Sequence, residues 1–186
     1  ECLPEETNRR IVDIISDVNL CYSEHARRYL MECGLPKERT FVTGSPMAEV
    51  LHANLDKIEA SDIHQRLGLT KGQYILLSAH REENIDMDRN FVQLFTAVNA
   101  MAEKYDMPIL YSCHPRSRKR LEATGFQLDS RVIAHEPLGF HDYNCLQMNA
   151  FAVVSDSGTL PEESSFFLSG GRPFPACLLY TSDAAD

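Results

Sequence analysis

Short, wholly apolar segments alternate with helical segments along this chain, and this alternation constrains the fold most. The segment 74–78, Tyr-Ile-Leu-Leu-Ser, is apolar along nearly its whole length. Such a strand belongs in a parallel sheet that is covered by helices on both faces. The pattern therefore predicts an α/β, doubly wound architecture. Expected strands are 17–22, 41–43, 74–78, 108–113, 131–134 and 151–155; expected helices are 4–16, 23–34, 47–55, 61–67, 91–104, 117–121, 141–149 and a last one from Thr159 onward.

The strand–helix pattern restarts after Ile58, which predicts two α/β units. Residues 1–50 are expected to be the C-terminal part of the first unit, 51–62 a connection and 63–176 a second, partial unit. Two such units bind nucleotides at the carboxyl ends of their strands, in a cleft between them.

Charge and cysteine content exclude several classes of protein. A net charge of -9 argues against a nucleic-acid partner, although it permits a small phosphorylated ligand. No apolar run approaches the roughly 20 residues of a membrane span, and no leader is evident, so the expected location is the cytoplasm. The six cysteines form no C-x-x-C pair and show no zinc spacing, so we expect buried thiols and no metal.

Both ends of the sequence predict a fragment. The chain opens without Met, directly in a helical pattern. Residues 177–186 have no helix or strand period and resemble the translation of a transposon-end sequencing adapter. We therefore expect 177–186 to be a non-native read-through tail.

Two clusters of polar residues follow expected strands and offer donors to an anion. His80 and Arg81, after strand 74–78, can present a ring N–H and a guanidinium to phosphate oxygens. The alternative is a charged surface turn in which Arg81 pairs with Glu82 or Glu83. After strand 108–113, either His114 or Arg116 can face the cleft, whereas the later cations, 118–120, are expected on a solvated helix face.

A third cluster joins strand 151–155 to the last helix. Ser157, Gly158 and Thr159 leave room for an anion at the helix start, where N–H groups and the helix dipole favour negative charge. A carboxylate one turn into the helix can accept from both hydroxyls of a ribose. The alternative is capping of the helix by Asp156 or Ser157, and capping can coexist with phosphate binding.

The fourth cluster, Pro4-Glu5-Glu6-Thr7-Asn8-Arg9-Arg10, opens the first helix. Two carboxylates at a helix start complement the helix dipole, which explains them without any function. The alternative is a catalytic acid or base aimed into the cleft.

Taken together, these segments resemble the non-hydrolysing UDP-N-acetylglucosamine 2-epimerase family over residues 4–175. The resemblance implies two Rossmann-like domains, in the GT-B arrangement of one large class of glycosyltransferases, here truncated at both ends, with 63–176 as the UDP-binding domain. The matching motifs are Pro4-Glu5-Glu6-x-Asn8-Arg9, Thr43-Gly44-Ser45-Pro46, His80-Arg81-Glu82-Glu83-Asn84, His114-Pro115 and Asp156-Ser157-Gly158-x-x-x-Glu162-Glu163.

The resemblance also implies roles for individual residues. Glu5 matches a carboxylate required for turnover, and His80 would act close to the diphosphate. Glu6 and His114 fall where some bacterial members bind a second, activating nucleotide sugar. The residues expected to bind UDP are Arg81 beside the diphosphate, Tyr143 against the uracil, Ser157, Gly158 and Thr159 on phosphate and Glu163 on the ribose.

The implied reaction interconverts UDP-N-acetylglucosamine and its manno epimer by eliminating UDP across C1–C2 and adding it back. It needs an acid and a base near C2, but no metal or redox cofactor. The family's other essential acids would precede Glu1, so the fragment by itself is expected to be inactive and the full-length parent to be a homodimer.

Other functions remain open. The sequence of 78–84 and 155–159 also resembles the branch of this family that forms UDP-N-acetyl-L-fucosamine for capsule and O-antigen. A UDP-sugar-dependent glycosyltransferase would keep the UDP site without needing the carboxylates of 4–10. A third class is a nucleotide-sugar binding module without catalysis.

Overall fold

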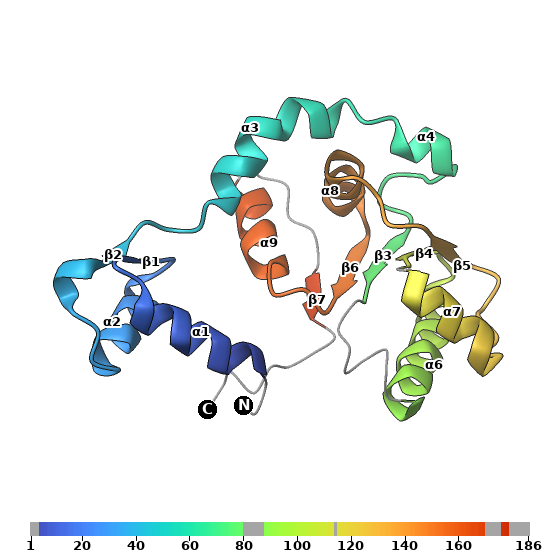
Figure 1. The fold of residues 1–186 in the computed structure, drawn as a ribbon. Helices are drawn as coiled ribbons and strands as arrows, with labels where there is room; N and C mark the ends of the chain where they lie inside the picture. The colour runs from blue at the N-terminus through green and yellow to red at the C-terminus, as the bar shows by residue number, and fades with distance from the viewer. Residues whose placement is uncertain (1–3, 80–87, 114, 170–175, 179–186) are drawn as a thin grey trace. The chain divides into compact units, whose positions relative to one another are not determined.

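The computed structural model describes residues 4–79, 88–113, 115–169 and 176–178, which fall into two units (Figure 1). The first unit ends at Val50 and the second begins at Leu51. The His80–Arg81 cluster and His114 lie outside the described residues, and so does the side chain of Glu5.

The first unit is a two-stranded parallel sheet with helices. Asn19 pairs with Thr40 and Cys21 with Val42. The Ser23 side chain caps the second helix by accepting from the Ala26 N–H at 3.2 Å, as the sequence predicted. Its elements are α1 (Pro4–Ile15), β1 (Asn19–Cys21), α2 (Glu24–Glu32), the 3-10 helix η1 (Lys37–Arg39), β2 (Thr40–Val42) and the start of α3 (Met47–Glu59).

Apolar side chains remain exposed on this first unit. Ile14 and Ile15 on α1 are 75% and 74% exposed, and Leu20 on β1 is 63% exposed. Two short strands are too few to cover the apolar faces of the helices beside them. The unit therefore presents the kind of surface that ordinarily packs against further elements.

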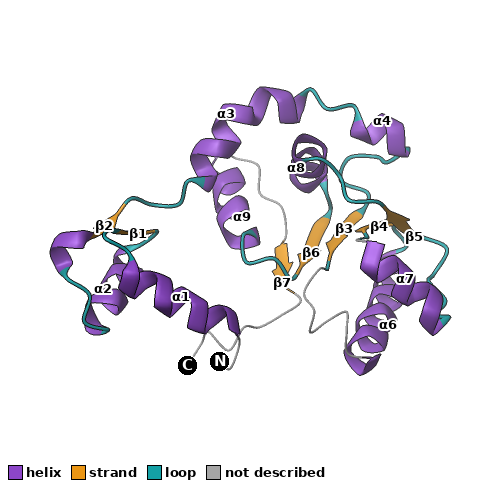
Figure 2. Cartoon of the chain, viewed as in Figure 1, coloured by secondary structure: helices purple, strands orange, loops and turns teal. Residues whose placement is uncertain are grey.

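The second unit contains a five-stranded, all-parallel sheet in the order β5-β4-β3-β6-β7 (Figure 2). From β3 the chain adds β4 and then β5 toward one edge of the sheet. It then returns to the other side of β3 with β6 and adds β7 beyond it, so the direction of strand addition reverses between β3 and β6. In open α/β sheets ligands bind at such a switch point, outside the carboxyl ends of the strands. The elements after α3 are α4 (Ile63–Leu67), β3 (Ile75–Ser78), α6 (Asp88–Tyr105), β4 (Ile109–Ser112), α7 (Pro115–Thr124), β5 (Val132–His135), α8 (Phe140–Asn149), β6 (Ala152–Ser155), α9 (Leu160–Ser169) and β7 (Ala176–Leu178).

Helices cover both faces of this sheet, with α6 and α7 on one side and α8 and α9 on the other (Figure 2). Side chains of a strand alternate between faces. Ile75 and Leu77 accordingly join the core formed with Phe91 and Phe95 of α6, whereas Leu76, also fully buried, does not belong to that cluster. Burial on both faces explains why β3 is apolar throughout and confirms the predicted α/β class.

Two segments differ from the sequence prediction. Helix α3 continues to Glu59 instead of ending at residue 55, because Leu51 and Ile58 on one face are completely buried. The segment 177–186, which has no strand period in the sequence, nevertheless contributes Cys177 and Leu178 to β7, where they pair with Val154 and Ser155.

The cysteines are only partly as expected. Cys21, Cys113 and Cys145 are buried, but Cys33 is exposed because it ends α2 at the surface. No helix in the described ranges combines the length and the apolar character needed to cross a membrane.

Candidate functional site

Three serines lie side by side at the carboxyl edge of the second sheet. Ser78 ends β3 and is in register with Ser112 at the end of β4 and Ser155 at the end of β6. All three are at most 4% exposed. Because their side chains are small, they leave space at the switch point of the sheet, where a ligand is expected.

A pocket of about 260 Å³ occupies this space. Its walls come from the strand ends, from the segment after β5, from α8 and from the start of α9. The residues that line it are Ser78, Ser112, Pro137, Leu138, Tyr143, Ser155, Ser157, Thr159, Leu160 and Glu163.

The turn between β6 and α9 presents hydroxyl groups to the pocket. The Ser157 hydroxyl lies 2.9 Å from that of Thr159 and accepts weakly from the Thr159 N–H at 3.4 Å. The Ser157 N–H donates to the Ser155 hydroxyl at 3.0 Å. Ser157 thus organises the turn by local hydrogen bonds, but α9 begins only at Leu160, so these bonds do not make Ser157 the N-cap residue that the capping alternative expected. The place of Ser157 in the pocket wall keeps phosphate binding open. A Cβ on Gly158 would meet nothing within 4 Å, so this turn has room around it.

Tyr143 forms the wall contributed by α8. Its hydroxyl lies near the Ser78 side chain at the end of β3. Burial raises the pKa of Tyr143, and the charges of Glu163 and Asp156 act in the same direction, whereas the nearby Ser78 hydroxyl acts against them. The phenol therefore stays protonated at neutral pH, and its side chain lines the pocket.

Glu163 reaches the pocket from the first turn of α9. Its Oε2 accepts a hydrogen bond from Nε2 of Gln147 at 2.6 Å. Among the described residues no ion pair involves this carboxylate. Its charge is thus stabilised by an amide of α8, and the side chain remains available to a donor within the pocket.

Helix α8 is anchored to its neighbours at both ends. The Asp142 carboxylate accepts from the Ser61 hydroxyl at 2.5 Å and from the Arg66 guanidinium at 2.6 Å. Burial by itself would raise the pKa of Asp142, but these hydrogen bonds outweigh it and leave the pKa below its usual value. The Tyr74 hydroxyl, next to β3, donates to the carbonyl of Leu146. These contacts set the position of the α8 face that carries Tyr143.

Four of the six residues predicted to bind UDP therefore lie in one pocket: Tyr143, Ser157, Thr159 and Glu163. Gly158 lies in the turn between two of them, and Arg81 falls outside the described residues.

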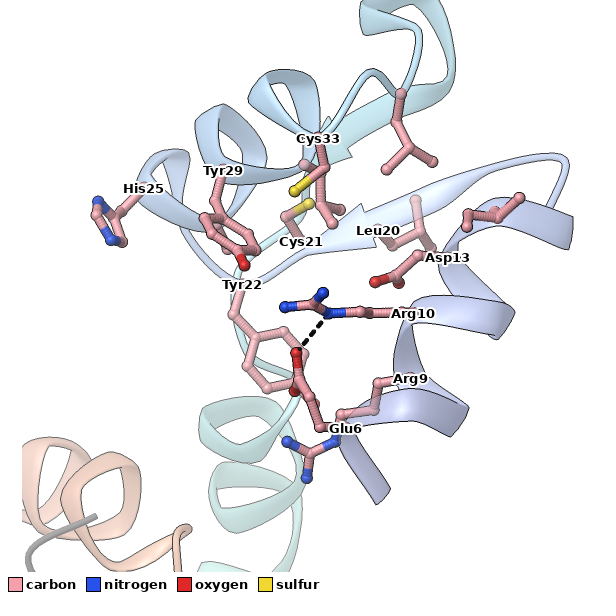
Figure 3. Close-up of a pocket in the computed structure, with 14 residues that line it drawn as sticks. Glu6, Arg9, Arg10, Asp13, Leu20, Cys21, Tyr22, His25, Tyr29 and Cys33 are labelled. Carbon is pink, nitrogen blue, oxygen red and sulfur yellow. Dashed lines mark hydrogen bonds and ion pairs between the residues drawn. The ribbon is translucent and has the colours of Figure 1, made fainter. Parts of the chain in front are cut away.

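Glu6 belongs to the first unit and lines a separate groove there, of about 1020 Å³ (Figure 3). Its carboxylate accepts from the Arg10 guanidinium at 2.9 Å, and Arg9, Asp13 and Tyr22 also line the groove. Helix α1 contributes the charged residues of this groove, whereas α2 and β1 contribute mainly apolar ones, among them Tyr29, Leu30 and Leu20.

The basic residues of α7 behave differently from the solvated face that the sequence predicted. Lys119 is exposed, but Arg118 and Arg120 are only half-exposed. The Arg120 guanidinium lies 5.6 Å from the centre of the Phe91 ring, and Arg118 donates to the carbonyl of Ala134 at 3.4 Å. The expectation was wrong for these two arginines because α7 packs them against the core.

Sequence reasoning missed Pro137, Leu138 and the roles of the three serines. The serines left a signal, since strands β3, β4 and β6 read Ile-Leu-Leu-Ser, Ile-Leu-Tyr-Ser and Ala-Val-Val-Ser. Three apolar strands that end in the same small polar residue are consistent with one shared edge. Among the described residues no cluster of His, Cys, Asp and Glu is arranged to hold a metal ion.

Comparisons with known proteins identify the family of this chain. The family model described as UDP-N-acetylglucosamine 2-epimerase matches residues 1–169. A curated UDP-N-acetylglucosamine 2-epimerase of Methanococcus maripaludis is 30% identical over an alignment of 169 residues, and the alignment covers 87% of this chain and 46% of that protein. The chain thus spans about half the length of the curated relatives it matches.

Solved structures show the same fold. That of UDP-N-acetylglucosamine 2-epimerase from Rickettsia bellii is 42% identical, with a TM-score of 0.78 over 94% of this chain and 45% of that one. The Methanocaldococcus jannaschii UDP-GlcNAc 2-epimerase in complex with UDP-GlcNAc and UDP is 27% identical, with a TM-score of 0.83 over 95% of this chain and 49% of that one. Given the family match over most of its length and the shared parallel α/β fold, the chain belongs to the UDP-N-acetylglucosamine 2-epimerase family.

Proposed function

We propose that this chain is part of an isomerase that interconverts UDP-N-acetylglucosamine and its manno epimer, and that the pocket between β3 and β6 binds the UDP moiety. One observation carries the proposal: in a member of this family, Tyr143, Ser157, Thr159 and Glu163 line one pocket at the switch point of a parallel sheet.

Each part of UDP has a chemically suitable neighbour in this pocket. Tyr143 offers a ring for the uracil to pack against. The Glu163 carboxylate can accept from ribose hydroxyls, and the hydroxyls of Ser157 and Thr159 lie where a helix start favours phosphate. A volume of about 260 Å³ lies just below the roughly 300–1,000 Å³ of small-molecule pockets, so it suits part of a nucleotide better than a whole nucleotide sugar.

The diphosphate requires positive charge beyond what this pocket supplies. Glu162 and Glu163 in the first turn of α9 are both acidic, and they offset part of the helix dipole that would attract an anion. We assign the balancing cation to Arg81, with His80 beside the diphosphate.

The proposed reaction breaks the C1–O bond and removes the C2 proton, which gives UDP and a 2-acetamidoglucal. UDP then adds back on the same side while a proton is delivered to C2 from the opposite face. Glu5 is proposed as a catalytic carboxylate and His80 as a second catalytic group, and neither a metal nor a redox cofactor is required.

We further propose that 1–50 is the C-terminal part of one Rossmann-like domain and 63–176 part of the UDP-binding one, joined through 51–62. Glu6 and His114 are candidates for a second nucleotide-sugar site. The complete enzyme is proposed to act as a homodimer in the cytoplasm and to supply surface polysaccharide synthesis, such as capsule or O-antigen.

A second candidate substrate is the 6-deoxy sugar nucleotide that yields UDP-N-acetyl-L-fucosamine. The sequence of 78–84 and 155–159 also resembles this branch, and the pocket would hold the same UDP moiety in both cases.

The test uses the complete gene product that contains residues 1–176 of this chain. Incubated with UDP-N-acetylglucosamine in deuterated water, it should form the manno epimer with deuterium at C2, as followed by NMR; the 186-residue chain alone should not. If that substrate is unchanged, the 6-deoxy talo sugar nucleotide is tried next. Transfer of the sugar to an acceptor, without epimerisation of either substrate, would instead identify a glycosyltransferase.

The pocket assignment has its own test. Glu163→Gln should weaken UDP binding by about 10- to 100-fold, because hydrogen bonds to a charged group contribute roughly 1.5–3 kcal/mol. Glu162→Gln is the matched control, since it removes the same charge one residue earlier from a side chain that does not line the pocket. Equal effects of the two substitutions on calorimetric affinity would contradict the assignment.

A further inference from the structure

Gln147 is a completely buried amide behind the pocket. It follows Tyr143 by four residues on α8, so both side chains lie on the same face of that helix. Tyr143 lines the pocket, whereas Gln147 is not among the lining residues. The Nε2 group of Gln147 instead donates to Oε2 of Glu163 at 2.6 Å. Gln147 therefore reaches the pocket only through Glu163.

This amide is costly for the fold. Its Oε1 is buried and accepts no hydrogen bond among the described residues. A buried acceptor without a partner destabilises the folded state, and a methionine of similar shape would remove that penalty. Among the described residues, the hydrogen bond to Glu163 is the one favourable polar contact shown for this side chain. The amide therefore contributes to the position of a pocket residue more than to the stability of the core.

We propose that Gln147 is a positioning residue, which holds Oε2 of Glu163 so that Oε1 faces the hydroxyl groups of a bound ribose. The inference rests on the proposed function, in which Glu163 accepts from those hydroxyls. A free glutamate side chain loses rotamer entropy when it binds a ligand. A carboxylate that is already held at one oxygen loses less, and preorganisation of this kind increases affinity.

The test compares two ligands, UDP and 2′-deoxy-UDP, by titration calorimetry on the complete gene product. The unsubstituted protein should bind UDP about tenfold more tightly than 2′-deoxy-UDP, which corresponds to about 1.4 kcal/mol. Gln147→Met should weaken UDP binding by about tenfold and the binding of 2′-deoxy-UDP, which keeps only the 3′-hydroxyl, by clearly less, so the preference for the ribonucleotide shrinks. The thermal midpoint should stay the same or rise.

Asn144→Leu is the matched control. Asn144 is also a buried amide of α8 with an unpartnered oxygen, but its Nδ2 donates to the carbonyl of Phe140 at 2.9 Å and not to a pocket residue. This substitution should change stability without changing the ratio of the two affinities. In a Glu163→Ala background, Gln147→Met should have little further effect on UDP binding, since the acceptor that Gln147 holds is already gone.

The outcomes separate the two proposals. An unchanged affinity ratio in Gln147→Met overturns the role of Gln147 and leaves that of Glu163 standing. If the unsubstituted protein does not distinguish the two ligands, the ribose contact fails and the positioning role fails with it. If both Gln147→Met and Gln147→Leu unfold, the amide serves the fold and the inference is overturned.

Discussion

The Tyr74 hydroxyl joins α4, β3 and α8 by two buried hydrogen bonds, and its removal should be costly. It donates to the carbonyl of Leu146 and lies 3.0 Å from Nε2 of His64. Tyr74 is completely buried and His64 is only 8% exposed. In Tyr74→Phe both partners lose a bond in a region that water scarcely reaches.

The expected loss follows from those two partners. A buried group left without a partner costs about 1–3 kcal/mol, so two would cost about 2–6 kcal/mol. Because His64 is slightly exposed, water can replace part of its lost hydrogen bond, so we expect the lower part of this range, about 2–4 kcal/mol. For a unit of this size we expect the thermal midpoint to fall by roughly 6–12 °C.

Tyr111→Phe is the matched control for this measurement. Tyr111 is also completely buried, in the neighbouring strand β4. Its hydroxyl lies near Ser117 and Cys113 but makes no hydrogen bond of good geometry with a described residue. Tyr111→Phe should therefore change the free energy of unfolding by less than about 0.5 kcal/mol, or increase it.

Urea denaturation followed by circular dichroism gives both free energies under the same conditions. The reasoning is refuted if the two tyrosines prove equally sensitive to loss of the hydroxyl, because burial alone would then account for the effect.

Three further predictions concern stability. Burial, and secondarily the charge of a nearby lysine, lower the pKa of His64, so the unfolded chain binds the proton more readily than the folded one. The free energy of unfolding should therefore fall as pH drops below about 6.5, by at most about 1.4 kcal/mol per pH unit. His64→Gln should flatten this slope in urea titrations at several pH values. Asp142→Asn should lower the free energy of unfolding by about 1 kcal/mol at pH 7, because exposure of the partner Arg66 keeps the ion pair weak. Because the pKa of Asp142 is lowered, the difference in stability between the two proteins should disappear as pH falls below about 3.9 and through the folded-state pKa. A constant difference down to pH 2 would count against the ion pair. Gly68 ends α4 with φ of 65°, so Gly68→Ala should cost about 1–2 kcal/mol although the site has open space, whereas Gly139→Ala, with φ of -66°, should be neutral or stabilising.

Much of the fold could be predicted because its signals are local. The continuous apolar run of β3, the Ser23 cap and the return of strand signals after each helix all depend on residues close together in sequence. These features predict element type and the parallel α/β class without any knowledge of distant contacts.

The candidate site was only partly predictable, since it depends on which strands become neighbours. Tyr143, Ser157, Thr159 and Glu163 were expected to bind one ligand through a family resemblance, while their common pocket depends on the strand order of the sheet. The contact between Gln147 and Glu163 joins residues on different helices, and no local pattern predicts it.

The sequence by itself determined the alternation of strands and helices, because backbone propensity and apolar periodicity act over a few residues. Only the tertiary structure decided that β3 lies between β4 and β6, which brings Ser78, Ser112 and Ser155 to one edge. It also decided that 176–178 pairs as β7, although those residues carry no strand pattern of their own. The physical reason is that pairing between strands and burial of amides depend on partners distant in the chain, which local sequence does not specify.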